Sequence, residues 1–202
     1  QSRAGGALDV KLTKEIVRSL NNFSISNGVT TFMTLLGAWS ILLARLSGQS
    51  DIVTGSPVAN RQHKELEPLI GFFINTLAIR VQVNDNMRVS ELLKVIKEST
   101  LKAQANQDIP YEQIVEIINP ERNTSYSPIF QVWINIDNTP DVGKLSLPNL
   151  TISEIDIPHK TTQYDLTLSL KEVNNEIIGN LEYNQDLFDR ITVQRFFSYF
   201  IN

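Results

Sequence analysis

The segment that most restricts the possible folds is the apolar run from Phe32 to Ala44, which is interrupted only by polar or small residues at Thr34, Gly37 and Ser40. This run is too short to cross a bilayer and suits a buried helix. Helical spacing extends it to about Thr30–Leu46, with Gly48 placed to end it. Because such a helix is apolar nearly all round, it predicts a core that covers the helix on most sides.

Helical patterns also occur on both sides of this segment. Thr13, Ser90 and Asp189 are each placed as the N-cap of a further helix, and Asp108 with Pro110 marks the start of a short one that runs to Ile118. The apolar positions with helical spacing are Leu12, Ile16, Val17, Leu20 and Phe23, then Val89, Leu92, Leu93 and Ile96, and finally Ile191, Phe196 and Phe200.

Strands are predicted between and after these helices. Asp51–Val58 is typical of a short strand that runs into a Gly-Ser-Pro turn, and beyond Pro128 the apolar period changes to two. The Asn174-Asn175 pair predicts a hairpin turn. The alternating positions are Leu77, Ile79, Val81 and Val83; Phe130, Val132, Ile134 and Ile136; Leu150, Ile152, Ile155 and Ile157; Tyr164, Leu166, Leu168 and Leu170; and Ile177 to Tyr183. The order predicts an α/β fold, a mixed sheet with packed helices, in a single domain over residues 1–202.

Composition narrows the possible partners. The net charge of -4 gives no basic surface for nucleic acid or an anionic membrane. The absence of cysteine excludes disulfides and thiolate metal sites, and fits a cytoplasmic location. The sequence begins at Gln1, with no initiator methionine and no recognisable signal peptide, so we expect the chain to be part of a longer protein.

A search for catalytic chemistry finds no complete set of groups. His63 and His159 lie in polar stretches without a carboxylate or second histidine in a recognised pattern, and we interpret both as surface residues. Gly55-Ser56-Pro57 lacks the glycine pattern of a nucleophile elbow, and no metal-ligand spacing occurs. Asp108 and Glu112 fit the start of a helix better than an acid–base pair. We therefore assign no catalytic residue and no metal site to this chain.

Four ordered segments nevertheless form a recognisable set: Gly55–Arg61, Ile70–Arg80, Asn106–Glu112 and Arg122–Val132. In this order and spacing they resemble the later motifs of the condensation domains of nonribosomal peptide synthetases. Tyr164–Leu166 and Leu181–Phe188 resemble the closing strands of the same domain. The motif residues are Gly55, Pro57 and Arg61; Gly71, Phe73, Asn75, Thr76 and Arg80; Gln107, Asp108, Pro110 and Glu112; and Arg122, Ser125 and Pro128.

The chain departs from the family pattern in two ways. Asn123 stands where the family usually has an aspartate, and the catalytic His-His-x-x-x-Asp-Gly motif of the first half of the domain is absent. The resemblance therefore implies the C-terminal lobe of a two-lobed fold similar to chloramphenicol acetyltransferase. The parent protein is then an amide-forming acyltransferase, and this chain alone has no catalytic activity.

The resemblance also implies a mechanism and partners. In the family, phosphopantetheine arms of carrier domains enter a tunnel between the lobes, where an acceptor amine attacks the donor thioester with help from a histidine of the missing lobe. Gly55–Arg61 would belong to the floor loop of that tunnel, and a latch would lie between Asn138 and Gln163. The implied partners are the N-terminal lobe, peptidyl carrier domains and an adenylation domain, and no cofactor is bound directly.

Several roles stay open at this point. Arg80 and Arg122 fit structural ion pairs better than oxygen-binding roles, whereas Asn75 and Ser125 fit a tunnel-facing role and a backbone-satisfying role equally well. The chain could also be a non-catalytic remnant that packs against an adenylation domain, or an epimerase-type relative. A missing partner lobe predicts an exposed apolar patch on this one.

Overall fold

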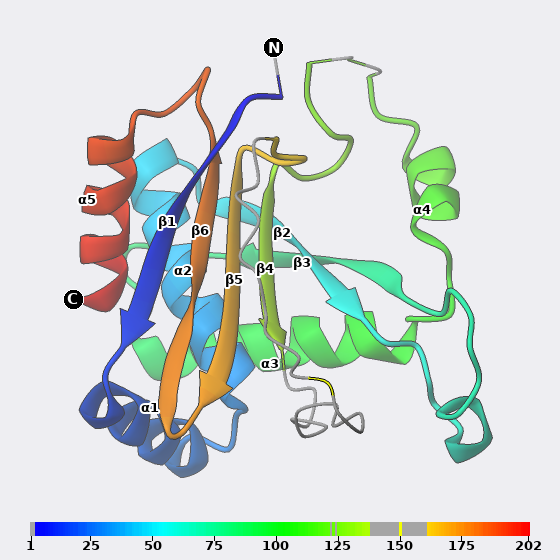
Figure 1. Cartoon of the computed structure of the whole chain (residues 1–202), viewed down its shortest axis with the longest axis horizontal. Helices are drawn as coiled ribbons and strands as arrows, with labels where there is room; N and C mark the ends of the chain where they lie inside the picture. The colour runs from blue at the N-terminus through cyan, green and yellow to red at the C-terminus, as the bar shows by residue number, and fades with distance from the viewer. Residues whose placement is uncertain (1–2, 122, 124, 138–149, 151–160) are drawn as a thin grey trace.

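Six strands, among the residues described, form one mixed sheet in the order β1-β6-β5-β4-β2-β3 in the computed structural model of the chain (Figure 1). The structure describes residues 3–121, 123, 125–137, 150 and 161–202. The strands are β1 (Gly5–Leu12), β2 (Asp51–Val58), β3 (Asn75–Gln82), β4 (Val132–Asp137), β5 (Leu166–Val173) and β6 (Glu176–Asn184). The helices are α1 (Lys14–Ser26), α2 (Thr31–Ser47), the short 3-10 helix η1 (Lys64–Leu66), α3 (Val89–Ala105), α4 (Tyr111–Ile118) and α5 (Arg190–Ile201).

Parallel and antiparallel pairings are combined in this sheet. β4 pairs in parallel with β2 and β5, whereas the pairs β2–β3, β5–β6 and β1–β6 are antiparallel. A parallel pair requires a crossover connection, and helices supply it for β2 and β4. The predicted α/β class, a mixed sheet with packed helices, is confirmed.

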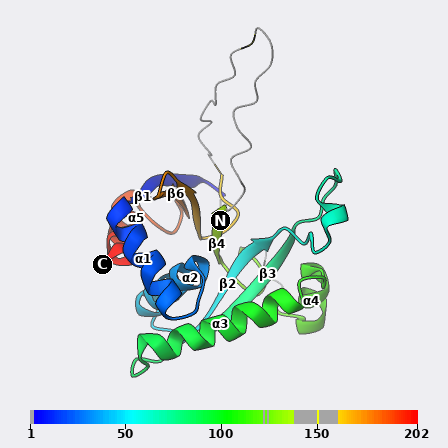
Figure 2. The same cartoon turned by 90° about the horizontal axis from the view of Figure 1, so that it is seen from below.

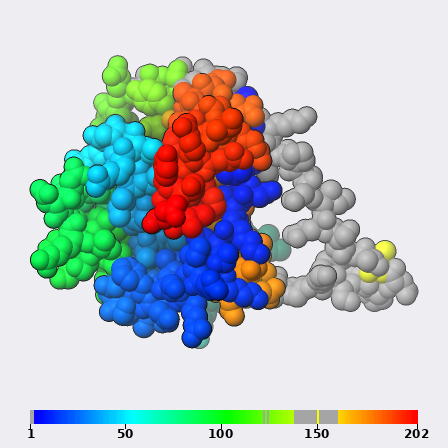
Figure 3. Space-filling view, turned by 90° about the vertical axis from the view of Figure 1, so that its left-hand side faces the viewer, coloured from blue at the N-terminus to red at the C-terminus, as the bar shows by residue number. Residues whose placement is uncertain are grey.

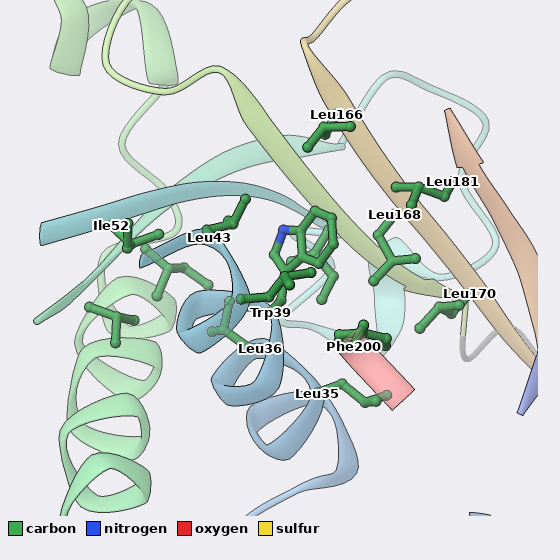
Figure 4. Close-up of a cluster of buried hydrophobic side chains, with 14 of the residues drawn as sticks. Leu35, Leu36, Trp39, Leu43, Ile52, Leu166, Leu168, Leu170, Leu181 and Phe200 are labelled. Carbon is green, nitrogen blue, oxygen red and sulfur yellow. The ribbon is translucent and has the colours of Figure 1, made fainter. Parts of the chain in front are cut away.

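Helix α2 lies at the centre of the core, as its apolar sequence predicts. Leu36 and Trp39 are fully buried, and the Trp39 indole meets the Phe200 ring of α5 edge to face at 5.9 Å (Figure 4). The helix begins where the Thr30 hydroxyl accepts a hydrogen bond from the Met33 amide, and it ends at Gly48 with a φ of 69°. The first three turns of the helix are thus packed between the sheet and the neighbouring helices, while its last residues, from Arg45 on, are exposed.

The two faces of the sheet differ. Leu166, Leu168 and Leu170 of β5 point into the core, while the residues between them, such as Thr167 and Ser169, are more exposed. Figure 2 shows helices α1, α2 and α3 gathered on one side of the strands. The helix-covered face is therefore apolar, and the opposite face of β5 carries polar side chains such as Thr167 and Ser169.

Some local predictions were wrong. β1 was not predicted, and Leu12 belongs to this strand rather than to α1. The N-cap of α3 is Arg88 and not Ser90, and the Arg88 amide donates to the Glu91 carboxylate at 2.8 Å. The predicted strand near 150–157 lies outside the described residues apart from Leu150.

The described residues contain neither a single membrane-spanning helix nor a metal-binding cluster. No single helix there is both long and apolar enough to span a bilayer, although α1 and α2, bent by 103° where they meet, would pass together on length and composition. No cluster of three or more carboxylate or imidazole side chains is placed to hold a metal ion within these described ranges.

Candidate functional site

Asn75, the first residue of β3, ties two of the sequence motifs together. Its Nδ2 donates to the carbonyl oxygens of Gln107 and Ile109, both at 2.7 Å. Its Oδ1 accepts from the amides of Thr76 at 2.8 Å and Tyr111 at 3.3 Å. The side-chain amide thus satisfies backbone groups on β3 and on the α3–α4 connection, which is one of the two roles left open by the sequence.

Arg61 organises the loop between β2 and β3, residues 59–74, here called the β2–β3 loop. Its guanidinium donates to the carbonyl oxygens of Leu66, of Glu67 at 3.2 Å and of Leu69 at 2.8 Å. The guanidinium carbon also lies 4.2 Å from the centre of the Phe73 ring, a cation–π distance. One side chain therefore holds both halves of the loop.

Apolar side chains point outward from the same loop. Ile70 and Phe72 are almost completely exposed, at 104% and 91%, and Leu69 and Ile74 are at least half exposed. Gly71 lets the backbone pass close to the Phe73 ring, since a Cβ at this position would lie 2.9 Å from Phe73 Cε2. Figure 2 shows the loop projecting away from the helices and sheet. The loop thus presents an apolar tip to its surroundings.

A second tie joins this loop to the α3–α4 connection. Gln62 Nε2 donates to Asp108 Oδ1 at 2.9 Å. Pro110 precedes α4 and its carbonyl oxygen accepts from the Gln113 amide at 3.0 Å, while Glu112 lies in the first turn of α4. Asp108 and Glu112 do not form a facing acid–base pair, because Asp108 is bonded to the loop instead.

Gly55 and Pro57 lie within β2 rather than in a turn after it, so that prediction was wrong. Gly55 is opposite Ala78 of β3, and Pro57 is opposite Thr76. A Cβ at Gly55 would lie 2.2 Å from Phe130 Cε2 and 2.6 Å from Trp133 Cε3. The glycine is required because two aromatic rings cover it, and its backbone is ordinary strand.

These rings belong to a cluster that sequence reasoning missed, formed by Tyr111, Phe130, Trp133 and Tyr164. Trp133 and Tyr164 stack with ring centres 5.1 Å apart, and Phe130 lies 5.4 Å from Tyr111 and 5.5 Å from Tyr164. All four rings fall within or beside quoted motifs, but nothing local indicates that they meet. The cluster joins α4, β4 and the start of β5.

Tyr111 also links α4 to the fourth motif. Its hydroxyl donates to the Pro128 carbonyl at 2.6 Å. Burial, with smaller contributions from Tyr164 and Glu112, raises the pKa of Tyr111 to about 12. Burial also raises the pKa of Tyr164. Both phenols are therefore neutral hydrogen-bonding groups at ordinary pH and do not act as bases.

The remaining motif residues are separate from this network. Arg80 forms a two-pronged ion pair with Asp51, with Nη2 at 2.7 Å from Oδ2, and its hydrogen bonds hold the pKa of Asp51 below the ordinary value. The Ser125 amide donates to Asn123 Oδ1 at 2.8 Å, and Ser125 lines a cavity of about 410 Å³. Arg122 and His159 lie outside the described residues, and the His63 side chain is exposed.

The arrangement holds backbone segments in place but supplies no reacting group among the described residues. Asn75 and Asp108 tie the α3–α4 connection to β3 and to the β2–β3 loop, and Arg61 binds carbonyl oxygens of its own loop. The result is a junction of β3, the α3–α4 connection and the projecting β2–β3 loop.

Comparison with known proteins gives a consistent result. The family model described as the condensation domain matches residues 1–202. The chain is 44% identical over 199 residues, 98% of its length, to malpinin synthetase of Mortierella alpina, and 41% identical over 202 residues, 100% of its length, to a linear gramicidin synthase of Brevibacillus parabrevis. It spans only 3% and 4% of those two relatives.

Solved structures agree with these relatives. The chain superposes with a TM-score of 0.89 on the X-domain from teicoplanin biosynthesis, at 25% identity, with 98% of this chain and 46% of that one covered. For a four-domain nonribosomal peptide synthetase bound to AMP and glycine, the TM-score is 0.86 at 22% identity, covering 98% and 17%. The predicted fold of the chloramphenicol acetyltransferase-like class is confirmed.

Proposed function

Since this chain belongs to the condensation domain family, we propose that it forms one wall of a tunnel in which an acceptor amine attacks a carrier-bound acyl thioester. In that reaction the amine nitrogen forms an amide bond to the acyl carbon, the carbon–sulfur bond breaks, and the phosphopantetheine thiol takes up the proton lost by the amine. Residues 1–202 would act as the C-terminal lobe, and the base would come from the other lobe.

The observation that carries the proposal is the apolar tip of the β2–β3 loop. Ile70 and Phe72 are almost fully exposed on a loop whose backbone is held by Arg61. Large apolar side chains in that state are typical of a surface that another part of a protein covers. The chain covers 46% of a solved relative, so a second half of similar size is available there to cover it.

The polar face of the sheet supports the same assignment. Asp9, Asn180, Ser169 and Asn135 lie opposite one another across β1, β6, β5 and β4. Such a face suits a hydrated passage for an amide-containing arm better than it suits an apolar core. Under the proposal, carrier domains deliver their phosphopantetheine arms to this passage, and the protein works in the cytoplasm.

The test is reconstitution from two halves. This chain is mixed with the preceding half of the same synthetase, which carries the histidine motif, and with loaded donor and acceptor carrier domains. We expect dipeptide only when both halves are present, and none when the second histidine of that motif is replaced by alanine. Dipeptide above background from this chain alone would contradict the proposal.

Loop variants sharpen that experiment. Phe72→Ser should weaken association of the two halves by about tenfold, because it removes a large exposed apolar contact. Ile25→Ser on α1 is the matched control, since Ile25 is also strongly exposed, at 77%, but lies away from the loop. Equal weakening by both substitutions would show that the loop is not the contact.

A second candidate is a non-catalytic platform for an adenylation domain. It is favoured by Ile191 and Tyr199, which are exposed on α5 at 70% and 57%. Figure 3 shows α5 on the surface, beside α1. This alternative predicts binding to the adenylation domain in the presence of substitutions such as Phe72→Ser, and no dipeptide under any combination of halves.

A further inference from the structure

A cavity of about 590 Å³ lies at the amino ends of β2, β4 and β5, bounded by the end of α2 and by α5. This is the opposite end of β2 from the β2–β3 loop, so it is separate from the junction described above. Its volume falls in the range of small-molecule sites. Its apolar wall includes Leu43, Leu46, Ile52, Val132, Leu166 and Phe196, of which Leu43, Ile52 and Leu166 are seen in Figure 4.

One carboxylate on this wall has no partner among the residues that the structure describes. Asp165 lies between Tyr164 and the first residue of β5, and its side chain makes no hydrogen bond or ion pair with those residues. Its backbone is fixed, because its amide donates to the Gln131 carbonyl at 2.9 Å and its carbonyl accepts from the Asn184 amide at 3.0 Å. Burial alone raises the pKa of this carboxyl.

The other acidic group on the wall is already neutralised. Asp51 is held by Arg80 in the ion pair described above. Arg3 lines the adjoining polar cavity that also includes Asp165, but the two side chains form no ion pair. Asp165 is therefore the group through which the cavity can recognise a charge.

The backbone beside the cavity is strained. Ile129 has a φ of 71°, a left-handed conformation that a β-branched residue rarely adopts. Strain of this kind persists where the surrounding structure enforces it, often next to binding sites. Ile129 lines the cavity together with Asp165.

We infer that this cavity binds an organic cation with an apolar body, its ammonium or guanidinium group paired with Asp165 and its hydrocarbon part against the α2 and α5 side chains. A carboxylate already held partly out of water gains more from such a pairing than a solvated one does, and the apolar wall adds burial. The inference does not depend on the proposed tunnel. The cation could come from a free molecule or from a basic side chain elsewhere in the synthetase.

The test uses 4-phenylbutylammonium as the probe, with 4-phenylbutanol as its uncharged match, in calorimetric titrations of this chain at neutral pH. We expect the ammonium to bind, and Asp165→Asn to weaken it about tenfold or more without changing the weaker affinity for the alcohol. Leu46→Arg would place a cation in the cavity and should abolish binding; Leu46 is partly exposed, so the fold tolerates the change. Failure of the probe to bind, or equal binding to wild type and Asp165→Asn, would overturn the inference.

A parallel titration of the intact synthetase identifies the source of the cation. Binding of the probe to both proteins supports a free molecule as the occupant. Binding to this chain but not to the intact synthetase supports a basic side chain of the synthetase that already fills the cavity.

Discussion

The core around α2 and the β2–β3 loop are held in place by different kinds of contact, apolar packing in the core and hydrogen bonds in the loop. In the core, Leu36 and Trp39 are buried and the backbone follows from their packing. In the loop, Ile70 and Phe72 are exposed; Arg61 binds the loop carbonyls, and Asn75 at the end of the loop binds the α3–α4 connection. The difference shows that the loop depends on a few hydrogen-bonding groups, so that single substitutions can loosen it while the core stays folded.

Gly55→Ala should have the largest effect, because Gly55 is buried against two aromatic rings. The new Cβ would overlap the Phe130 and Trp133 rings, at 2.2 and 2.6 Å. Overpacking of this kind costs about 3 kcal/mol of unfolding free energy. Urea unfolding measures it. Gly48→Ala is the control: no atom lies within 4 Å of its Cβ, and its φ of 69° should cost about 1 kcal/mol. Equal losses would contradict the ring-contact explanation.

Asn75→Ala tests the junction between core and loop. It leaves the Gln107 and Ile109 carbonyls without their donor, and should cost about 2 to 3 kcal/mol of unfolding free energy. Asn75→Asp keeps the acceptor but places a carboxylate beside those two carbonyls, so it should be no less destabilising. Urea unfolding, with hydrogen exchange at the Tyr111 amide, measures both effects. A stable Asn75→Asp protein would show that the two donor bonds contribute little.

Tyr111→Phe should have a smaller effect, about 1 kcal/mol, through the lost hydrogen bond to Pro128. It should also change the response to alkali. The folded pKa of Tyr111 is raised to about 12, so its contribution is fully present below pH 10 and is lost as the pH rises from 10 towards 12. Urea midpoints between pH 8 and 11.5 should therefore fall less steeply in the variant. Identical slopes would contradict the assignment.

Arg61→Ala should have the smallest effect on global stability, since the loop lies outside the core. We expect an unchanged urea midpoint but faster chymotrypsin cleavage at Phe72 and Phe73, because the guanidinium no longer ties the loop carbonyls. Arg80→Ala is the matched control. It removes another arginine, one on β3 whose ion-pair partner Asp51 lies at the end of β2 that is far from the loop tip. Equal cleavage of both variants would show that Arg61 does not order the loop.

The sequence could predict features that depend on neighbouring residues, but not features that depend on contacts between distant segments. Alternation at Leu166, Leu168 and Leu170 and the cap at Asp189 are local, and both predictions are confirmed. β1 was missed because its order comes from pairing with β6, at the far end of the chain. The resemblance of the chain to the condensation domain family is confirmed. Their contacts could not be predicted, since Asn75 binds backbone carbonyls and Gly55 faces rings from β4 and the segment before it.

The pairing of β1 with β6 has a consequence for biosynthesis. Gly5 lies opposite Asn184, so β1 cannot pair with β6 until nearly all of residues 1–202 have been made. At ordinary translation speeds that delay is roughly ten to forty seconds. During this time the backbone groups of β1 are unpaired, and they can pair with other segments until β6 is available.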